Sequence, residues 1–244
     1  MEKKKIKLMS FNTLHCLDYN KMLSSGEHKI DFQVTADAIK KYNPDIVGLN
    51  EIRDKGPYIE EFDRQPGILS ELTGISHYYF AKAIEVLGEN PYGNAILSEY
   101  PIISAETVPV PDPDPKTGDG YYESRCLLKA KLEGGITVLV IHFGLNRDEQ
   151  QNAVDTVLQH IEKEKCILMG DFNVTPDNEV LKPIRERMKD AADYFNQPLL
   201  SFPSDKPEVK IDYIFVSPDI EVVSADIPGI VASDHRPHIA EITL

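Results

Sequence analysis

Several apolar stretches of this 244-residue chain end in acids, amides or histidine, which a buried strand does not need. In LMGDFNVTPDN, residues 168–178, apolar residues lead to Asp171 and Asn173, and Pro176 then stops any continuing ladder of strand hydrogen bonds. Asp171 and Asn173 either cap a turn or face a ligand. The other polar residues at or beside strand ends are Asn12, Glu51, His142, Asp212, Asp234 and His235.

Each of these residues alone has an ordinary structural explanation, as a turn cap or a hydrogen-bonded core histidine. Together they form a set of carboxylates, amides and histidines, which suits a hard metal ion and a phosphate. A divalent cation held by a carboxylate would cancel the charge of a phosphoester, and a histidine paired with a carboxylate would transfer a proton. The residue types therefore predict metal-assisted hydrolysis of a phosphoester.

The strands that would position these residues are recognised by apolar runs and alternation. They are predicted at 5–12, 45–52, 76–84, 94–104, 124–132, 136–142, 165–170, 211–217, 220–225 and 237–243. No repeat or shift in composition marks a boundary along the chain. A single domain spanning residues 1–244, with mixed strands and helices outside them, is the simplest account.

Helices are predicted between several of these strands. They fall at 31–42, with Asp31 as the N-cap, at 58–73 with an interruption near Pro66, at 147–164 and at 178–187. The segment 108–122 is rich in proline, aspartate and glycine, which predicts a loop.

The composition narrows the class of protein. The formal net charge of −14 weighs against tight non-specific binding of nucleic acid, although a local basic groove or bound cations would override it. No apolar run approaches the roughly 20 residues of a membrane span. The N-terminus MEKKKIKLMSFN lacks the apolar region of a signal peptide, so a cytoplasmic protein is expected. Cys16, Cys126 and Cys166 show no metal-site spacing and are expected to be buried thiols.

Eight segments, in a fixed order, resemble the endonuclease/exonuclease/phosphatase family. They are SFN (10–12), GLNE (48–51), YGNAILSEYPI (92–102), ESRCLL (123–128), VIHFG (140–144), GDFN (170–173), KIDYIFVS (210–217) and SDHRPHIAEI (233–242). GDFN alone is only suggestive, whereas the ordered set ending in SDHRP is specific and covers nearly the whole chain, most like the compact bacterial branch. The resemblance implies a deoxyribonuclease-like α/β (α+β) fold: a four-layer sandwich of two packed mixed β-sheets flanked by helices.

The resemblance also implies a role for each site residue. The expected metal ligands are Asn12, Glu51 and Asp234, with Glu51 as the main ligand of Mg²⁺ and Mn²⁺ as the alternative ion. The expected catalytic residues are His142, Asp171, Asn173, Asp212 and His235. Asn94 and Arg125 are expected to contact the substrate phosphate. Either Asp171 or His235 would accept the proton of the attacking water, because a coupled set titrates as a unit.

Two positions depart from the family pattern. Asn50 stands before Glu51 where glutamine is usual, which keeps the amide but shortens the side chain. His238 occupies the last predicted strand, where an apolar residue is common, and we expect it to be structural.

The predicted function is a Mg²⁺-dependent phosphoester hydrolase that acts as a monomer. A small-molecule substrate is favoured, because Asp112, Asp114 and Asp119 in the predicted loop would repel a polyanion. The alternatives are a nuclease acting on DNA or RNA, and a sphingomyelinase-like lipid phosphodiesterase. A catalytically silent binding domain of the same fold is the alternative from a different class.

Overall fold

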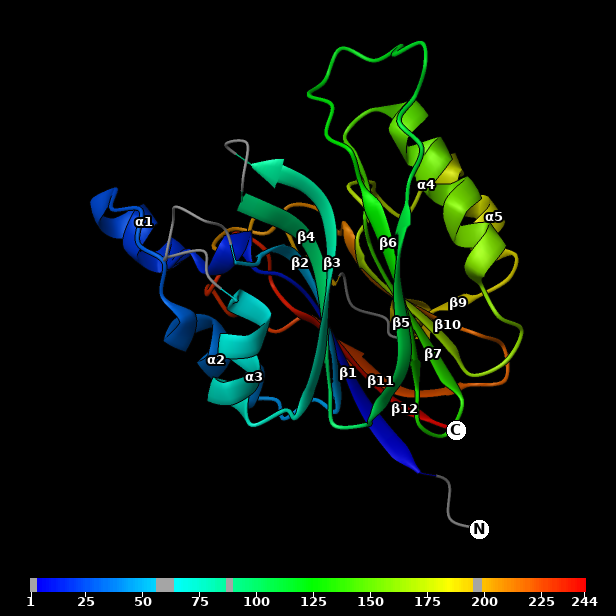
Figure 1. Cartoon of the computed structure of the whole chain (residues 1–244), viewed down its shortest axis with the longest axis horizontal. Helices are drawn as coiled ribbons and strands as arrows, with labels where there is room; N and C mark the ends of the chain where they lie inside the picture. Colours follow the sequence, from blue (N-terminus) through cyan, green and yellow to red (C-terminus); the bar gives the residue numbers. More distant parts are fainter. Residues whose placement is uncertain (1–3, 56–63, 87–89, 195–198) are drawn as a thin grey trace.

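The computed structural model describes residues 4–55, 64–86, 90–194 and 199–244. In this part of the chain, two six-stranded sheets pack face to face (Figure 1). The first sheet has the order β11-β12-β1-β2-β4-β3, and the second has the order β5-β6-β7-β8-β10-β9. Each sheet is mixed, because β1 and β2 are parallel in the first, β7 and β8 are parallel in the second, and the other pairs are antiparallel.

The strand bounds agree closely with the alternation in the sequence. In the first sheet they are β1 Lys5–Asn12, β2 Ile46–Arg53, β3 His77–Val86, β4 Asn90–Ser98, β11 Glu221–Asp226 and β12 His238–Thr243. In the second sheet they are β5 Ile102–Pro109, β6 Cys126–Leu132, β7 Ile136–His142, β8 Cys166–Asp171, β9 Lys189–Asp190 and β10 Asp212–Val216.

Helices cover the outer face of each sheet (Figure 1). Those on the side of the first sheet are α1 Tyr19–Ser25, α2 Phe32–Lys40 and α3 Gln65–Thr73, and those on the second are α4 Arg147–His160 and α5 Lys182–Arg185. Short 3₁₀ turns occur at Leu14–Cys16, Glu179–Leu181 and Ala191–Tyr194. Asp31 caps α2 as predicted, since its side chain accepts a hydrogen bond from the Gln33 amide at 3.2 Å. In the described ranges, no helix has the length and apolar character that crossing a bilayer requires.

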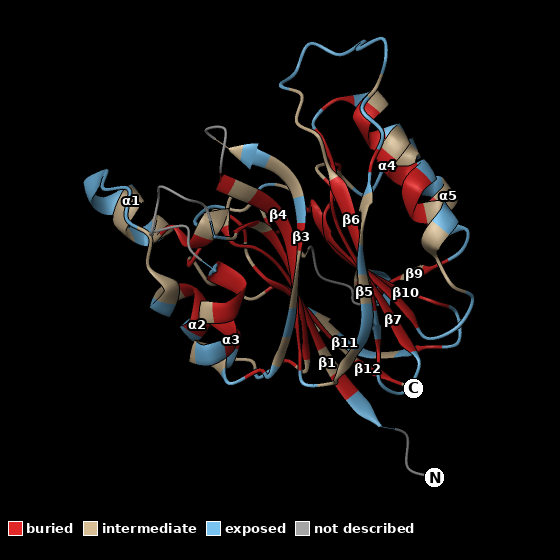
Figure 2. Ribbon diagram, viewed as in Figure 1, coloured by how far each residue is buried: buried red, intermediate tan, exposed pale blue. Residues whose placement is uncertain are grey.

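Three buried apolar layers hold the sandwich together (Figure 2). The central layer contains residues of both sheets, such as Leu8 and Val140, and the outer layers lie between each sheet and its helices. Neighbouring residues of one strand enter different layers, as Leu8 and Met9 show. This architecture confirms the predicted four-layer sandwich.

The central layer becomes polar at one end. The inward-facing residues of β8 run from Ile167 through Met169 to Asp171, and those of β1 run from Leu8 to Asn12. The same alternation brings polar side chains to the ends of β7 and β10. The strand period therefore places the candidate site residues where the apolar core stops.

Two predicted elements differ from the structure. The predicted strand 94–104 is two strands, because the chain turns at Glu99–Pro101 and continues as β5 in the other sheet. The predicted helix 58–73 begins at Gln65 with Pro66 in its first turn, where proline is well tolerated, rather than being interrupted there. Residues 58–63 of that prediction lie outside the described residues.

Candidate active site

One amide joins carboxylates from the two sheets. Asn12, the last residue of β1, donates through Nδ2 to Glu51 Oε1 at 3.1 Å and to Asp171 Oδ2 at 3.0 Å. Glu51 lies at a break in the pairing between β2 and β4, and its φ of 55° is left-handed. A bulge of this kind redirects the side chains of a strand. The ends of β1, β2 and β8 thereby meet at one point between the sheets.

His235 lies between two buried aspartates. Its Nδ1 is 2.8 Å from Asp212 Oδ2, and its Nε2 is 3.5 Å from Asp171 Oδ2. Burial alone would lower the pKa of His235, but the charges of Asp212 and Asp171 outweigh burial and raise it to about 10. The ring of Phe202 packs against the imidazole with 4.8 Å between centroids. His235 is therefore fixed in orientation by contacts on several sides.

Burial raises the pKa of Asp171 to about 7; the charge of Asp212 adds to this effect, and His235 opposes it. Burial is also the main cause of a raised pKa at Glu51, followed by the negative charge of Asp234. The pKa of Asp234 is raised, again mainly by burial. Burial thus disfavours the negative charge of all three carboxylates, and a bound cation would offset this effect.

Both ring nitrogens of His142 face nitrogen donors. Arg125 Nη1 lies 3.2 Å from His142 Nδ1, and a guanidinium group can only donate. On the other side of the ring, His142 Nε2 is 3.2 Å from Asn173 Nδ2, which also donates, and 3.5 Å from Asp171 Oδ2. Burial, and then the charge of Arg125, lower the pKa of His142 well below its ordinary value. His142 is therefore a neutral imidazole that can accept a hydrogen bond from only one of these two donors.

The donor set fits a hard divalent cation. Asp171, Asp212 and His235 each offer a ligand atom, and these atoms lie within 4.8 Å of one another. Asp212 Oδ1 is buried and has no hydrogen-bond partner among the described residues. Carboxylate and amide oxygens are the ligands that Mg²⁺ prefers. This geometric group and the predicted ligands Asn12, Glu51 and Asp234 lie around the same point.

The predicted site residues lie in one connected network. Asn12, Glu51, Asn94, Arg125, His142, Asp171, Asn173, Asp212, Asp234 and His235 are linked by the contacts above, by the effect of Asp234 on Glu51, and by Asn50, which bonds both Asn94 and Asp171. Asn94 is buried, with 2% exposed, and its amide bonds to Asn50 and to the Cys126 carbonyl.

Two contacts of the site were not foreseen from the sequence. Glu123 Oε1 lies 2.5 Å from Arg125 Nη1, so the guanidinium already has an acidic partner. The only indication of Glu123 in the sequence was its place in the motif ESRCLL. Phe202 was not predicted as a site residue, because its contact with His235 joins positions far apart in the sequence.

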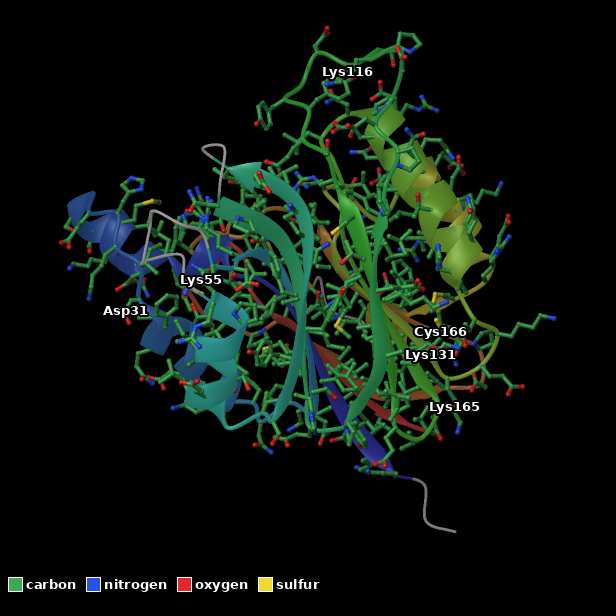
Figure 3. The ribbon with its side chains drawn as sticks, in the orientation of Figure 1. Asp31, Lys55, Lys116, Lys131, Lys165 and Cys166 are labelled. Carbon is green, nitrogen blue, oxygen red and sulfur yellow. The ribbon has the colours of Figure 1, made fainter. Side chains whose placement is uncertain are left out.

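The segment between β5 and β6 packs onto the start of α4. Asp148 Oδ2 accepts hydrogen bonds from the Thr117 amide and from Tyr122 Oη, each at 2.8 Å, and Asn146 Oδ1 accepts one from the Gly120 amide. Lys116 marks this loop at the upper end of the molecule in Figure 3. The loop leads directly into Glu123 and Arg125, so it forms one wall beside the site. Its residues Asp112, Asp114 and Asp119 are all exposed.

A two-sheet sandwich whose central layer ends in acids, amides and histidines is the arrangement of the deoxyribonuclease-like class. The chain belongs to the Endonuclease/Exonuclease/phosphatase family, whose model matches residues 9–235 and confirms the resemblance seen in the motifs. Members of this family are typically phosphoester hydrolases, and the family generally uses divalent metal ions.

Similar proteins support the same assignment. The chain is 27% identical over 233 residues to the uncharacterized protein YbhP of Escherichia coli, covering 85% of this chain and 87% of that protein. The endonuclease/exonuclease/phosphatase of Beutenbergia cavernae superposes with a TM-score of 0.77 and 22% identity, over 99% of this chain and 72% of that one. A mannosyl-6-phosphatase of Bacteroides thetaiotaomicron gives a TM-score of 0.75 and 17% identity, over 98% and 100%. At such identities the two structures establish the fold alone.

Proposed function

We propose that this protein is a Mg²⁺-dependent hydrolase of phosphoesters, in which water attacks the phosphoryl group. One observation carries the proposal: Asp171 Oδ2 has three polar neighbours, Asn12 Nδ2 at 3.0 Å and the Nε2 atoms of His142 and His235 at 3.5 Å. A single carboxylate oxygen is thus in contact with the residues expected to hold metal, activate water and bind phosphate. Three polar neighbours at one buried carboxylate oxygen suit proton transfer at a charged substrate better than they suit the stability of the fold.

Asn12, Glu51 and Asp234 are the residues that would hold the cation. When bound, Mg²⁺ would neutralise the phosphoryl group and make its phosphorus more susceptible to attack. Asp171 and His235 act as one coupled proton-accepting unit for the attacking water, and Asp212 keeps His235 in orientation through Nδ1.

The remaining polar groups bind the phosphate. His142 and Asn173 lie on the same side, with His142 Nε2 3.2 Å from Asn173 Nδ2. Arg125 approaches with its charge partly balanced by Glu123, which moderates the attraction for highly charged substrates. These groups would stabilise charge on the phosphate oxygens and on the departing oxygen in the transition state.

A small phosphomonoester or phosphodiester is the substrate class we favour. The protein carries a net charge of −14, and the loop beside the site adds exposed aspartates, which would repel a long polyanion. The similarity in fold to a mannosyl-6-phosphatase agrees with this preference. A nuclease is the second candidate, because bound cations can reverse the local charge.

The test compares substrates under one set of conditions. Purified protein is incubated with a phosphomonoester panel, a chromogenic phosphodiester, phospholipid, RNA and plasmid DNA, with Mg²⁺ or with chelator. We expect turnover of a small phosphoester that chelator abolishes and that Glu51→Ala loses, while Glu186→Ala at an exposed position keeps it. No turnover of any substrate would favour a silent binding domain. Rapid plasmid nicking at near-physiological salt would overturn the preference for small substrates.

A further inference from the structure

We propose that Asn50 and Asn94 form a two-amide bridge between the sheets, which sets the position of Asp171 relative to Glu51. Neither residue would touch the reacting atoms in this role, so both are positioning residues. The catalytic consequence rests on the proposed function, because it assumes that Asp171 and Glu51 act on a common substrate. The bridge itself rests on hydrogen bonds that the structure shows.

The bridge uses both amides fully. Asn50 Oδ1 accepts the backbone N–H of Asp171 at 2.9 Å, and Asn50 Nδ2 donates to Asn94 Oδ1 at 2.8 Å and to the Ile141 carbonyl at 3.0 Å. Asn94 Nδ2 then donates to the Cys126 carbonyl at 2.9 Å. Asn50 is 0% exposed and Asn94 is 2% exposed, so water does not compete for these bonds.

These bonds cross from one sheet to the other. Asn50 and Asn94 lie on β2 and β4 of the first sheet, whereas their backbone partners Cys126, Ile141 and Asp171 lie on β6, β7 and β8 of the second. Below this level the sheets meet through apolar side chains such as Leu8 and Val140. Apolar contact is not directional, so it brings the sheets together without fixing their relative position closely. Directional bonds to strand ends in the second sheet supply that restraint.

The position of the bridge links it to the chemistry. Asn50 directly precedes Glu51, the expected main metal ligand, and its side chain holds the backbone of Asp171, the expected proton acceptor. A displacement of either carboxylate by a fraction of an ångström would misalign metal, water and phosphate. Asn94 accepts a hydrogen bond from Asn50 and donates one to the Cys126 carbonyl, so it holds the Asn50 side chain in place.

A matched control exists on the same strand. Asp171 ends β8, and Asn50 Oδ1 accepts its amide; Cys166 begins β8, and Ser217 Oγ accepts its amide at 3.0 Å. Both are buried side-chain acceptors for a backbone N–H of β8, and Ser217 lies at the end away from the site. Ser217→Ala therefore removes a buried side-chain acceptor from a backbone N–H of β8, as Asn50→Leu does, but leaves the position of Asp171 unchanged.

The experiment measures kcat, KM and Mg²⁺ activation for Asn50→Leu, Asn94→Leu, the double variant and Ser217→Ala, each below its unfolding temperature. We expect Asn50→Leu to lower kcat by about 10- to 100-fold, with KM and the half-activating Mg²⁺ concentration changed by less than about 3-fold. Asn94→Leu should lower kcat less, and the double variant should resemble Asn50→Leu because the residues act as a unit. Ser217→Ala should keep kcat within about 2-fold, as expected for a change remote from the site.

A second measurement does not depend on activity. Amide hydrogen exchange at Asp171 should accelerate by about 10-fold or more in Asn50→Leu, and should stay unchanged in Ser217→Ala. Unaltered exchange at Asp171, a kcat within about 2-fold of the wild type in folded Asn50→Leu, or a loss confined to KM would overturn the proposal. If the wild type hydrolyses no phosphoester, the proposed function fails, and the exchange rate alone decides whether the bridge holds Asp171.

Discussion

Asp212 and Asp171 are paired directly across neighbouring antiparallel strands, and His235 contacts both carboxylates. The pairing places the two acids on the same face of the second sheet, because opposed residues on adjacent strands share a face. If the pairing of β10 and β8 shifted by one residue, the side chain of one of the two aspartates would face the outer apolar layer. The position of His235 thus depends on strand register as well as on its own loop.

Asp212→Asn should lower kcat by about 100-fold or more while the protein stays folded. The amide cannot supply the negative charge that holds the His235 imidazole through Nδ1 at 2.8 Å, so the ring would lose both orientation and basicity. Steady-state kinetics with the substrate identified from the panel checks the change, and circular dichroism checks the fold. Asp155→Asn on the exposed side of α4 is the control, and should keep wild-type kcat. A kcat for Asp212→Asn within about 3-fold of the wild type would show that this pair is structural.

Glu51→Gln should abolish stabilisation by Mg²⁺. At about 100 times its dissociation constant, a ligand that binds only the folded state raises the free energy of unfolding by about 2.7 kcal/mol. Without metal the variant should be at least as stable as the wild type, since the neutral amide removes repulsion between Glu51 and Asp234. Thermal unfolding with and without Mg²⁺ separates the two effects, and Glu186→Gln is the control. A full Mg²⁺ shift in Glu51→Gln would show that the ion binds elsewhere.

The sequence predicted most of the strands from short apolar runs and from alternation. β8 is buried on both faces, so a continuous apolar run followed by Asp171 marks both the strand and its polar tip in the sequence. The division between β4 and β5 is not visible in this way. Ile96 and Ile102 both pack into the central layer, and the change of sheet between them depends on which strands they pair with.

Two short elements, α1 and β9, were not predicted. Helix α1 buries no residue, and β9 has only two residues, so neither leaves a periodic pattern. At the site, residue types indicated the chemistry, but the bond from Asn50 to Asp171 joins positions 121 residues apart. Such a bond follows from the packing of the sheets, which local sequence does not encode.

Gly170→Ala should destabilise the protein by about 3 kcal/mol or more. Gly170, the glycine of GDFN, has a φ of 149°, and a Cβ there would overlap the carbonyl oxygen of Ile141 on the neighbouring strand. The overlap involves backbone, so β7 and β8 would have to separate. Chemical denaturation gives the free energy of unfolding.

Gly135→Ala is the matched control for this change. Gly135 also has a positive φ, 77°, but its added Cβ would meet nothing within 4 Å. Its cost should be limited to the backbone strain of about 1–2 kcal/mol. If both variants lost the same free energy of unfolding, the overlap of the added Cβ with the Ile141 carbonyl oxygen would cost nothing.

His238 should make the folded state sensitive to acid. Burial, followed by the charge of Lys210, lowers the pKa of this histidine to about 4 in the folded protein, against about 6.5 when unfolded. Below about pH 6.5 the unfolded chain binds a proton that the folded chain excludes, so stability falls as the pH falls through this window to about 4. Between pH 7 and pH 5 the loss from this one residue is about 2 kcal/mol. His238→Leu should reduce the pH dependence of unfolding by that amount.

Ser10→Ala provides the comparison for His238→Leu. Ser10 pairs with His238 between β1 and β12, and its buried Oγ has no hydrogen-bond partner among the described residues. Removing this hydroxyl should change stability by the same amount at every pH, because serine does not titrate in this range. Urea unfolding at a series of pH values measures both variants. If His238→Leu kept the wild-type slope, the acid sensitivity would arise from other histidines, with His142 first because its pKa is also lowered by burial.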